Sequence, residues 1–443
     1  MQQYDVVVIG AGPAGGGIAV SLAQAGKQVA MIEADGVGGV CPLRGCNPKK
    51  VLMSGSEAVE TARHLEGKGI TGRPVINWPE LDAFKRSFVA PVSSRAEKSY
   101  QSYGINIIHG RAEFTGPNSV QVNEQLLKAE TICICTGYVP NIPKIPGIGH
   151  TITSDDFLTM HTLPRHMVFM GGGFIAFEFA HMVARAGARA TVLVRSNRAL
   201  RGFDGILVDK LIEASFEAGI DVRLNTPVES FEKHEDGISV NTRKITFEAD
   251  AVINCSGRVP ALEGLGLDKA GIKAAKDGIP VNEHMQCLTA PHIYAVGDVA
   301  STPYALTPTA SYEADIAARN ILEPGSATIN LRGVPSVVFT LPPLARIGLT
   351  QEQADMEKIP YKIVENELVD WFPWQRLGEK HGGCRILVDE NGQKVLGAHI
   401  LGHHAEELAN TFALIIRHGI PLEKLRDTLW TYPTSGYYIK YMF

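Results

Sequence analysis

Two stretches of the chain repeat one pattern of apolar and polar positions. Residues 4–9 (YDVVVI) form an apolar run, glycines follow, residues 17–26 have helical periodicity, and residues 28–33 (QVAMIE) are apolar again. Residues 167–194 repeat the order, from MVFMG through FEFAHMVARAG to ATVLV. Short continuous apolar runs are typical of buried parallel strands, so each stretch predicts a strand–helix–strand unit.

The glycines of the first unit are spaced for a dinucleotide. Gly10, Gly12 and Gly15 join the strand to the helix, and Glu33 ends the second strand. In such a turn the first glycine permits the tight bend, the second lets the backbone approach a pyrophosphate, and the third lets helix and strand pack closely. The helix N-terminus stabilises phosphate charge, and an acid at the position of Glu33 accepts from a ribose hydroxyl. The unit therefore predicts FAD or NAD binding.

The second unit differs where the ribose is recognised. Its turn carries Gly171, Gly173 and Ala176, but its second strand ends in Val194 rather than an acid. Three arginines follow that strand: Arg195, Arg198 and Arg201. A carboxylate repels a 2′-phosphate and an arginine pairs with it, so this unit predicts NADPH, with a surface basic cluster as the alternative.

Two later stretches fit a flavin site. Residues 293–300 (IYAVGDVA) form an apolar strand that ends in a glycine turn with Asp298, placed to bond ribityl and pyrophosphate groups. Residues 306–322 open with Thr307 and Pro308, which we expect to be the N-cap and first residue of a helix. The positive end of that helix would favour a reduced, anionic flavin ring.

Composition narrows the class of protein. The chain has 443 residues, 45% of them hydrophobic, and a formal net charge of −5. The length predicts two to four domains, and the charge gives no reason to expect nucleic acid or an anionic membrane. The start, MQQYDVVVIG, enters a strand at once without a basic region or cleavage site, and its apolar run is too short to span a bilayer. We therefore expect a cytoplasmic protein.

Seven cysteines are scattered along the chain, which argues against a disulfide framework. Cys133, Cys135 and Cys255 lie in apolar runs and are predicted to be buried. Cys287 and Cys384 have no local partner. Cys41 and Cys46, with four residues between them, are a pair flanked by loop and helix signals. Their spacing allows a metal clip, a structural disulfide or a redox-active pair, and no further ligand at zinc spacing follows Cys46, so no metal site is predicted.

The motifs together resemble a known family. Their order is GxGxxG, CxxxxCxPK, CTG, a second GxGxxA, VGD and LTP, as in the FAD-dependent class I pyridine nucleotide-disulfide oxidoreductases such as glutathione reductase, dihydrolipoamide dehydrogenase and mercuric reductase. The resemblance covers nearly the whole chain. It implies an α/β fold with two Rossmann-like domains of three-layer ββα form and a C-terminal α+β dimerisation domain. The implied segments are 1–150 and 259–330 for FAD, 151–258 for NADPH and 331–443 for the interface of a homodimer.

The resemblance also assigns residues around a redox-active disulfide. Cys46 would be the flavin-side sulfur and Cys41 the outer one that exchanges with substrate. Residues 48–62 read as a helix, so its N-terminus and Lys49 would lower the pKa of Cys46. Lys49 would pair with Glu178 near the flavin, and Phe174 would cover the nicotinamide pocket. Further cofactor positions implied are Thr136, Gly137 and Arg258. Electrons would pass from NADPH (or NADH) through FAD to the Cys41–Cys46 disulfide and then to an acceptor.

The sequence departs from the family at its C-terminus. Disulfide reductases there carry His-Pro-Thr-x-x-Glu, whereas this chain has Tyr432 and Tyr437 in place of the histidine and glutamate. The usual base is absent, and such a base contributes about 10²–10⁴-fold. Tyrosine is a poor base at neutral pH but a usable acid. His403 and His404 are expected to be solvated or packing residues. Asp315 replaces the arginine that grips glutathione, and as a buried acid it would disfavour that substrate.

Three functions remain open. The preferred one is an NADPH-dependent flavoenzyme that reduces a small disulfide or related sulfur species, with Tyr432 among its catalytic residues. The second is a reductase of a metal ion, quinone or other electrophile, since mercuric reductases also lack the His-Glu pair. The third is a redox sensor or flavoprotein subunit of a complex. The sequence does not name the acceptor.

Overall fold

The computed structural model describes residues 2–443, and they form two compact units. Unit 1 comprises residues 1–50, 83–141 and 258–331, and unit 2 comprises residues 51–82, 142–257 and 332–443. Three separate stretches of chain thus build each unit. The division of the sequence into FAD, NADPH and interface segments stays a prediction.

Unit 1 is built on a sheet whose main path runs β16-β17-β6-β1-β2-β3. The pairings of β1 with β2 and β6, of β2 with β3, and of β17 with β6 are parallel, while β4, β5 and β6 form an antiparallel run. A two-stranded ladder, β7 with β15, lies apart from it. The strands are β1 Gln2–Ile9, β2 Val29–Glu33, β3 Asn106–His109, β4 Ala112–Gly116, β5 Ser119–Val122, β6 Gln125–Ile134, β7 Tyr138–Pro140, β15 Arg258–Pro260, β16 Gln286–Cys287 and β17 Ala290–Ala295.

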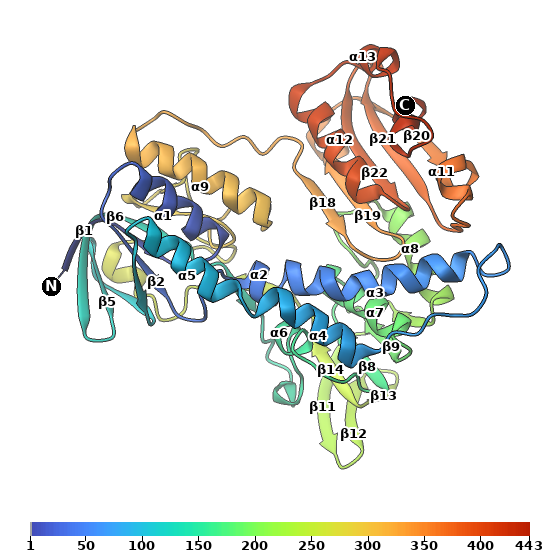
Figure 1. The fold of residues 1–443 in the computed structure, drawn as a ribbon, viewed down its shortest axis with the longest axis horizontal. Coiled ribbons are helices and arrows are strands. Elements are labelled where there is room, and N and C mark those ends of the chain that lie inside the picture. The colour runs from blue at the N-terminus through green and yellow to red at the C-terminus, as the bar shows by residue number, and fades with distance from the viewer. Residues whose placement is uncertain (1) are drawn as a thin grey trace. The chain divides into compact units, whose positions relative to one another are not determined.

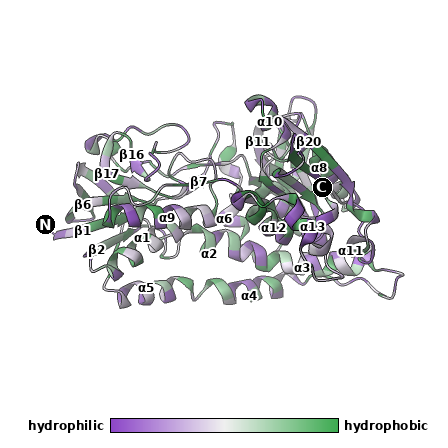
Figure 2. Ribbon diagram, turned by 90° about the horizontal axis from the view of Figure 1, so that it is seen from above, coloured by the Kyte–Doolittle hydropathy of each residue, from purple (hydrophilic) through white to green (hydrophobic). Residues whose placement is uncertain are grey.

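Helices α1 and α9 pack against each other beside this sheet (Figure 1). Both carry small and apolar residues, for example Ile18 and Leu22 of α1 and Ala314 and Ala317 of α9, all buried. The helices that lie in unit 1 or run across its boundary are α1 Pro13–Gln24, α2 Val40–Arg44, α3 Cys46–His64, α4 Trp78–Val89, α5 Val92–Ser102 and α9 Thr307–Leu322. In Figure 2 apolar and polar residues alternate along α3, α4 and α5, as expected of amphipathic helices.

Unit 2 contains the second strand–helix–strand unit. Its parallel sheet has the order β10-β9-β8-β14, and α7 packs on β8 and β9. An antiparallel sheet, β11-β12-β13, follows along the chain. The bounds are α6 Ser154–Phe157, β8 His166–Met170, α7 Phe174–Arg185, β9 Arg189–Leu193, α8 Gly205–Glu217, β10 Ile220–Arg223, β11 Val228–His234, β12 Gly237–Thr242, β13 Thr246–Ala249 and β14 Ala251–Asn254.

The C-terminal part of unit 2 is a five-stranded antiparallel sheet of order β18-β19-β22-β21-β20, covered by α12. Its core is apolar and includes Trp374, Ile386 and Phe412, each fully buried. The elements are β18 Pro335–Val338, β19 Leu344–Gly348, α10 Gln351–Glu357, β20 Tyr361–Glu367, α11 Phe372–Gln375, β21 Gly383–Asp389, β22 Val395–Leu401, α12 Ala405–His418 and α13 Leu422–Asp427.

The predicted fold class is confirmed. The first strand–helix–strand unit is β1-α1-β2 and the second is β8-α7-β9, both parallel as expected. Residues 2–443 contain no helix that is both long and apolar enough to cross a membrane. The cysteines predicted to be buried in apolar runs, Cys133, Cys135 and Cys255, are buried thiols.

One prediction about α9 is wrong. The N-cap of this helix is Leu306, with an extended backbone, and Thr307 is already the first helical residue. Pro308 fits the first turn in either arrangement, because proline lacks the amide hydrogen that would go unpaired there. The helix has no side-chain cap, and the hydroxyl of Thr307 lies 3.6 Å from the sulfur of Cys46.

Candidate active site

The first nucleotide turn adopts a geometry that glycine allows. Gly10 has φ of +108°, and a Cβ there would lie 2.4 Å from the carbonyl oxygen of Cys135. A Cβ on Gly15 would lie 1.9 Å from the carbonyl oxygen of Gly10. Gly12 is the N-cap of α1 and has no side chain to occupy the helix end, and the first turn of α1 carries no acidic residue. The positive end of α1 is therefore left for an anion.

Glu33 lies beside that turn. Its Oε2 accepts a hydrogen bond from the amide of Ala11 at 2.7 Å, and its Oε1 accepts from the amide of Asp35 at 2.7 Å. Each carboxylate oxygen keeps a second lone pair, so the group is oriented and still has capacity for a ribose hydroxyl.

Buried hydroxyls in unit 1 are consistent with a bound dinucleotide. Thr136 Oγ1 and Thr309 Oγ1 are buried and have no hydrogen-bond partner among residues 2–443. Unsatisfied buried hydroxyls are costly unless a ligand or ordered water pairs with them. Asp298 is also largely buried, and burial raises its pKa while the charge of Arg258 opposes the rise. Arg258 donates to the carbonyl oxygen of Tyr138 at 2.8 Å. These residues fit FAD.

The second nucleotide turn repeats the geometry. Gly171 has φ of +143°, and a Cβ there would lie 2.1 Å from the carbonyl oxygen of Cys255. Gly173 is the N-cap of α7, again without a capping side chain, and Ala176 is fully buried. Phe174 is half exposed at the start of the helix, and Glu178 is buried with its Oε1 accepting from the amide of Phe339 at 2.8 Å. The turn fits a nicotinamide dinucleotide.

The three arginines after β9 do not share one environment. Arg195 and Arg201 are exposed, and neither has an ion-pair or side-chain hydrogen-bond partner in the part of the chain that the structure describes. Arg198 is committed elsewhere, because its Nη1 pairs with Glu352 at 2.8 Å and its Nη2 donates to the carbonyl oxygen of Phe203 at 2.6 Å. Two cations, rather than three, are available for a 2′-phosphate.

The two active-site cysteine candidates come together at a helix start. Cys41 lies in the short helix α2 and Cys46 is the first residue of α3, with only Gly45 between the two helices. Both are thiols in this structure, and the Cys41 sulfur hydrogen-bonds the Cys46 sulfur. The two side chains are therefore neighbouring free thiols. No group of three or more His, Cys, Asp and Glu side chains in residues 2–443 is arranged to hold a metal ion.

The two thiols differ in acidity. The hydrogen bond from Cys41 is the largest cause that lowers the pKa of Cys46, and with Thr307 and the charge of Lys49 it outweighs burial and brings that pKa to about 6. The pKa of Cys41 is raised, first by the same hydrogen bond and then by burial. At neutral pH the reduced pair thus carries its negative charge on Cys46 and its proton on Cys41. The sequence predicted the effect of Lys49 but not the contact of Cys46 with Thr307, which is 261 residues away.

The C-terminal tyrosines form an aromatic cluster. The rings of Tyr432 and Tyr437 lie edge to face with centroids 4.9 Å apart, and Tyr432 is 61% exposed. Lys440 Nζ lies 4.1 Å from the centre of the Tyr437 ring, and the Tyr437 hydroxyl lies 3.3 Å from that of Tyr441. The hydrogen bond with Tyr441, followed by that with Lys440, lowers the pKa of Tyr437. The departure from His and Glu therefore leaves phenols, one of them acidified, at the chain end.

Two remaining sequence expectations concern other side chains. His403 and His404 stack on each other with centroids 3.9 Å apart, and burial first, then the charge of His404, lowers the pKa of His403 to about 4. They fit packing residues. Asp315 was expected to be a buried acid, which is wrong: it is exposed and lies 4.0 Å from Arg319, one helical turn away. Solvent screens its charge, so the argument against glutathione is weakened.

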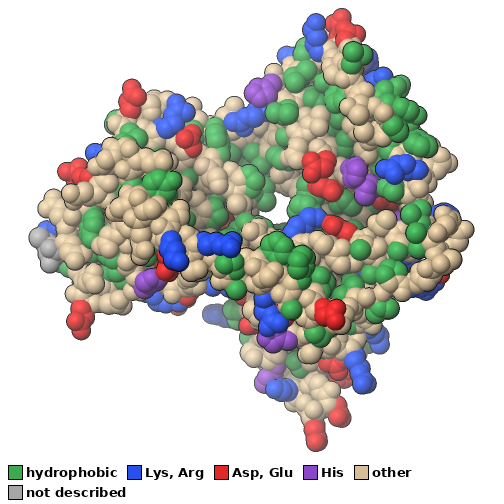
Figure 3. All heavy atoms as spheres, viewed as in Figure 1, with side chains coloured by type: hydrophobic (Ala, Val, Ile, Leu, Met, Phe, Trp, Pro, Cys, Tyr) green, Lys and Arg blue, Asp and Glu red, His purple; other side chains and the backbone are tan. Residues whose placement is uncertain are grey.

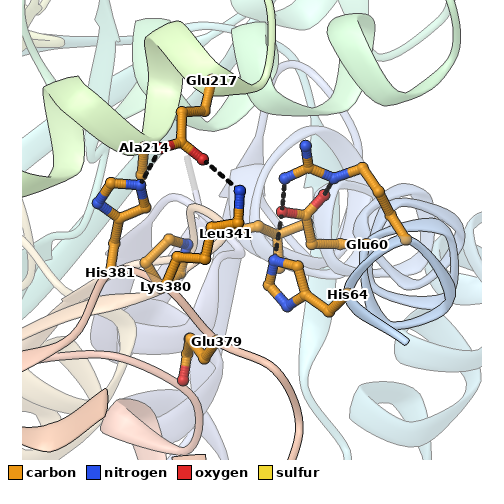
Figure 4. Close-up of a pocket in the computed structure, with 10 residues that line it drawn as sticks. Glu60, His64, Ala214, Glu217, Leu341, Glu379, Lys380 and His381 are labelled. Carbon is orange, nitrogen blue, oxygen red and sulfur yellow. Dashed lines mark hydrogen bonds and ion pairs between the residues drawn. The ribbon is translucent and has the colours of Figure 1, made fainter. Parts of the chain in front are cut away.

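A second charged cluster lines a pocket inside unit 2 (Figure 4). Glu60 is 7% exposed and pairs with Arg63 at 2.7 Å, His64 at 3.2 Å and Arg185 at 3.2 Å. Burial works to raise the pKa of Glu60, but the bond from His64 and the charges of Arg185 and Arg63 hold it well below its usual range. Elsewhere basic and acidic side chains are interspersed over the face shown in Figure 3.

Comparisons with known proteins agree with this geometry. Residues 4–314 match the family model of the pyridine nucleotide-disulphide oxidoreductases, and residues 334–442 match the dimerisation domain of that family. A dihydrolipoyl dehydrogenase of Chlamydia trachomatis serovar D is 31% identical over 98% of this chain and 94% of its own length. A mercuric reductase of Staphylococcus aureus is 31% identical over 98% of this chain and 80% of its own length.

A solved structure is also similar over the full chain. The Cu(II) complex of the HOCl-induced flavoprotein disulfide reductase RclA from Escherichia coli has a TM-score of 0.90 and 29% identity, and the match covers 100% of this chain and 99% of that one. The chain belongs to the pyridine nucleotide-disulphide oxidoreductases. It is an oxidoreductase of a family that uses FAD and NAD(P)H, and it carries the family's dimerisation domain.

Proposed function

We propose that the protein is an NADPH-dependent FAD enzyme that reduces a small disulfide or related sulfur acceptor through Cys41 and Cys46. The observation that carries this proposal is the hydrogen-bonded pair of thiols at the start of α3, with the pKa of Cys46 lowered to about 6. A static structural pair has no need of a stabilised thiolate, whereas thiol–disulfide exchange does.

Residues of both nucleotide turns would hold the cofactors. FAD would lie against Gly10, Gly12, Gly15 and Glu33, within segments 1–150 and 259–330. Its further contacts would be Thr136, Gly137, Arg258, Asp298 and Thr307. NADPH would bind segment 151–258 at Gly171, Gly173 and Ala176, with Arg195 and Arg201 on its 2′-phosphate. When bound, FAD supplies the two-electron relay between the coenzyme and the disulfide.

The thiol chemistry then has defined steps. Cys41, after losing its proton, attacks one sulfur of the acceptor disulfide and forms a mixed disulfide, which releases the other half as a thiolate. The Cys46 thiolate attacks Cys41, releases the second thiolate and closes the Cys41–Cys46 bond. One NADPH and one proton thus yield two thiols and NADP⁺. Lys49 and the start of α3 stabilise the negative charge on Cys46, and Glu178 is the proposed partner of Lys49.

Deprotonation of Cys41 is the difficult step, because the hydrogen bond with Cys46 and burial raise the pKa of the Cys41 thiol. We propose that Tyr432 protonates the leaving group and that it reaches the cysteine pair of a second subunit, in a homodimer formed through residues 331–443.

The five other cysteines are buried thiols. Free thiols are typical of a reducing compartment, which supports a cytoplasmic location.

A second candidate function follows from the same tyrosines. A metal ion or other electrophile takes electrons from a thiolate pair without needing a protein acid, and Tyr432 and Tyr437 stand where disulfide reductases carry His and Glu. A mercuric reductase is among the similar proteins, and the similar RclA structure is a Cu(II) complex. These likenesses support reduction of a soft metal ion by the Cys41–Cys46 pair as the alternative.

NADPH oxidation with a panel of disulfides, quinones, Hg(II) and Cu(II) tests both functions. The preferred function predicts turnover with a disulfide that is lost in Cys46→Ser, lowered in Tyr432→Phe and unchanged in Cys287→Ser, a buried control. Turnover only with metal ions, unchanged in Tyr432→Phe, would replace it by the second candidate. A protein that NADPH does not reduce would refute both.

A further inference from the structure

The loop between β9 and α8, residues 195–204, is fastened by side chains of the C-terminal sheet region. Glu352 of α10 pairs with Arg198. Arg346 of β19 donates to the carbonyl oxygen of Gly202, and Arg385 of β21 pairs with Asp204. Arg195 and Arg201, the cations proposed for the 2′-phosphate, lie on this same loop.

The ion pair at Asp204 is buried. Arg385 and Asp204 pair at 2.9 Å, and their side chains are 5% and 6% exposed. Asp204 is also the N-cap of α8 and accepts from the amides of Ile206 and Leu207. Arg385 in turn donates to Gln351 Oε1 at 2.9 Å. One end of the loop is therefore fixed both to its own helix and to the start of α10.

A second ion pair, at Arg198, holds the middle of the loop. Its guanidinium donates to Glu352 at 2.8 Å and to the carbonyl oxygen of Phe203 at 2.6 Å, so it joins two parts of the loop to α10. The Ser196 hydroxyl donates to the carbonyl oxygen of Arg198 at 2.9 Å. Burial opposes ionisation of Glu352, but the bond from Arg198 lowers its pKa, so the pair is charged at neutral pH.

We infer that Arg198 and Glu352 are positioning residues for coenzyme selection: their ion pair holds Arg195 and Arg201 in place for a 2′-phosphate and does not itself bind it. The inference rests on the proposed use of NADPH. A group held in its binding geometry loses less conformational freedom when the ligand arrives, which strengthens binding. The dimerisation domain thus contributes, through α10, to the choice between NADPH and NADH.

Whether Glu352→Gln strengthens or weakens binding of a 2′-phosphate separates a positioning role from a purely electrostatic one. Glu352→Gln removes a negative charge and frees a guanidinium, and both changes favour an anion if the loop stays ordered. If the ion pair orders the loop, the same substitution weakens binding of the 2′-phosphate. Glu357→Gln is the matched control, because Glu357 is an exposed acid at the other end of α10 and has no ion-pair partner among residues 2–443.

Calorimetric titration of the FAD-loaded protein with 2′,5′-ADP and with 5′-ADP measures the effect without turnover. We expect Glu352→Gln to bind 2′,5′-ADP about threefold to fivefold more weakly, the size of one partly exposed charge pair, with 5′-ADP unchanged. Glu357→Gln should match the wild type for both ligands. Hydrogen exchange of residues 195–204 should be faster in Glu352→Gln and unchanged in the control.

The outcomes are distinct. If the wild type prefers 2′,5′-ADP and Glu352→Gln keeps or increases that preference, the inference alone is overturned and NADPH use stands. Equal weakening of both ligands also overturns it, because the pair would then support the domain in general. If the wild type binds both ligands equally, NADPH use and the inference fall together.

Discussion

The acidity of Cys46 provides the sharpest prediction, because the structure ranks its causes. The hydrogen bond from Cys41 is the largest, and Thr307 and Lys49 contribute less. Cys41→Ala removes that donor and leaves the helix start, Thr307 and Lys49 in place. We expect the pKa of Cys46 to rise from about 6 most of the way to the ordinary value of about 8.5.

The magnitude decides how the effect must be measured. With a pKa of about 6, about 90% of Cys46 is thiolate at pH 7, against about 3% for a pKa of about 8.5. That is a thirtyfold difference in population, but the more basic thiolate is roughly tenfold more nucleophilic. A single rate at pH 7 would therefore change only about threefold, whereas the midpoint of the pH profile would move by about two units.

The assay is iodoacetamide alkylation of Cys46 in the dithiothreitol-reduced protein from pH 5 to pH 10, followed by mass spectrometry of its peptide. Wild type should show a midpoint near 6 and Cys41→Ala a midpoint above 8 with a higher plateau. Cys287→Ala, which removes a buried cysteine elsewhere in unit 1, should match the wild type. A midpoint that stays near 6 in Cys41→Ala would show that Lys49 and the start of α3, rather than the Cys41 thiol, lower the pKa of Cys46.

Three further predictions concern a buried ion pair, the hydroxyl beside Cys46 and the first glycine turn. Glu60→Gln leaves the buried guanidinium of Arg185 without its carboxylate, so we expect about 3 kcal/mol less unfolding free energy by calorimetry. Because the folded-state pKa of Glu60 is lowered from its ordinary value of 4.5, that difference should be full above this pH and shrink as the pH falls below it; a pH-independent difference would contradict the assignment. Thr307→Val should raise the alkylation midpoint of Cys46 by about half to one unit, and no shift would exclude the hydroxyl as a donor. Gly10→Ala should abolish FAD retention on gel filtration, because its Cβ would overlap a backbone carbonyl; normal flavin content would contradict the proposed turn.

The sequence predicted those parts of the fold that depend on local pattern. The turns at Gly10 and Gly171 were found because the glycines, the apolar strands and the helices follow one another within about thirty residues. Both strand–helix–strand units have the predicted parallel pairing. Cys41 and Cys46 were singled out for the same reason, since their spacing and the helix that follows are local features.

What the sequence missed depends on contacts between distant segments. Thr307 was predicted to cap its own helix, but the fold places its hydroxyl against Cys46. Arg198 was grouped with Arg195 and Arg201. No local pattern indicates that it forms an ion pair with Glu352, 154 residues away. The ion pair of Glu60 with Arg185 was missed for the same reason, because the sequence near each residue gives no indication of the other.

In the proposed function, Cys41 and Cys46 accept the electrons of NADPH as a pair. Alkylation of the air-oxidised holoenzyme under anaerobic conditions, before and after one equivalent of NADPH, detects this transfer when the modified cysteines are mapped by mass spectrometry. We expect Cys41 and Cys46 to be protected before NADPH is added and both to be modified afterwards, with the five buried cysteines unmodified throughout. Free thiols at these two positions before NADPH is added, or a linked pair that persists after it, would exclude the pair as the electron acceptor.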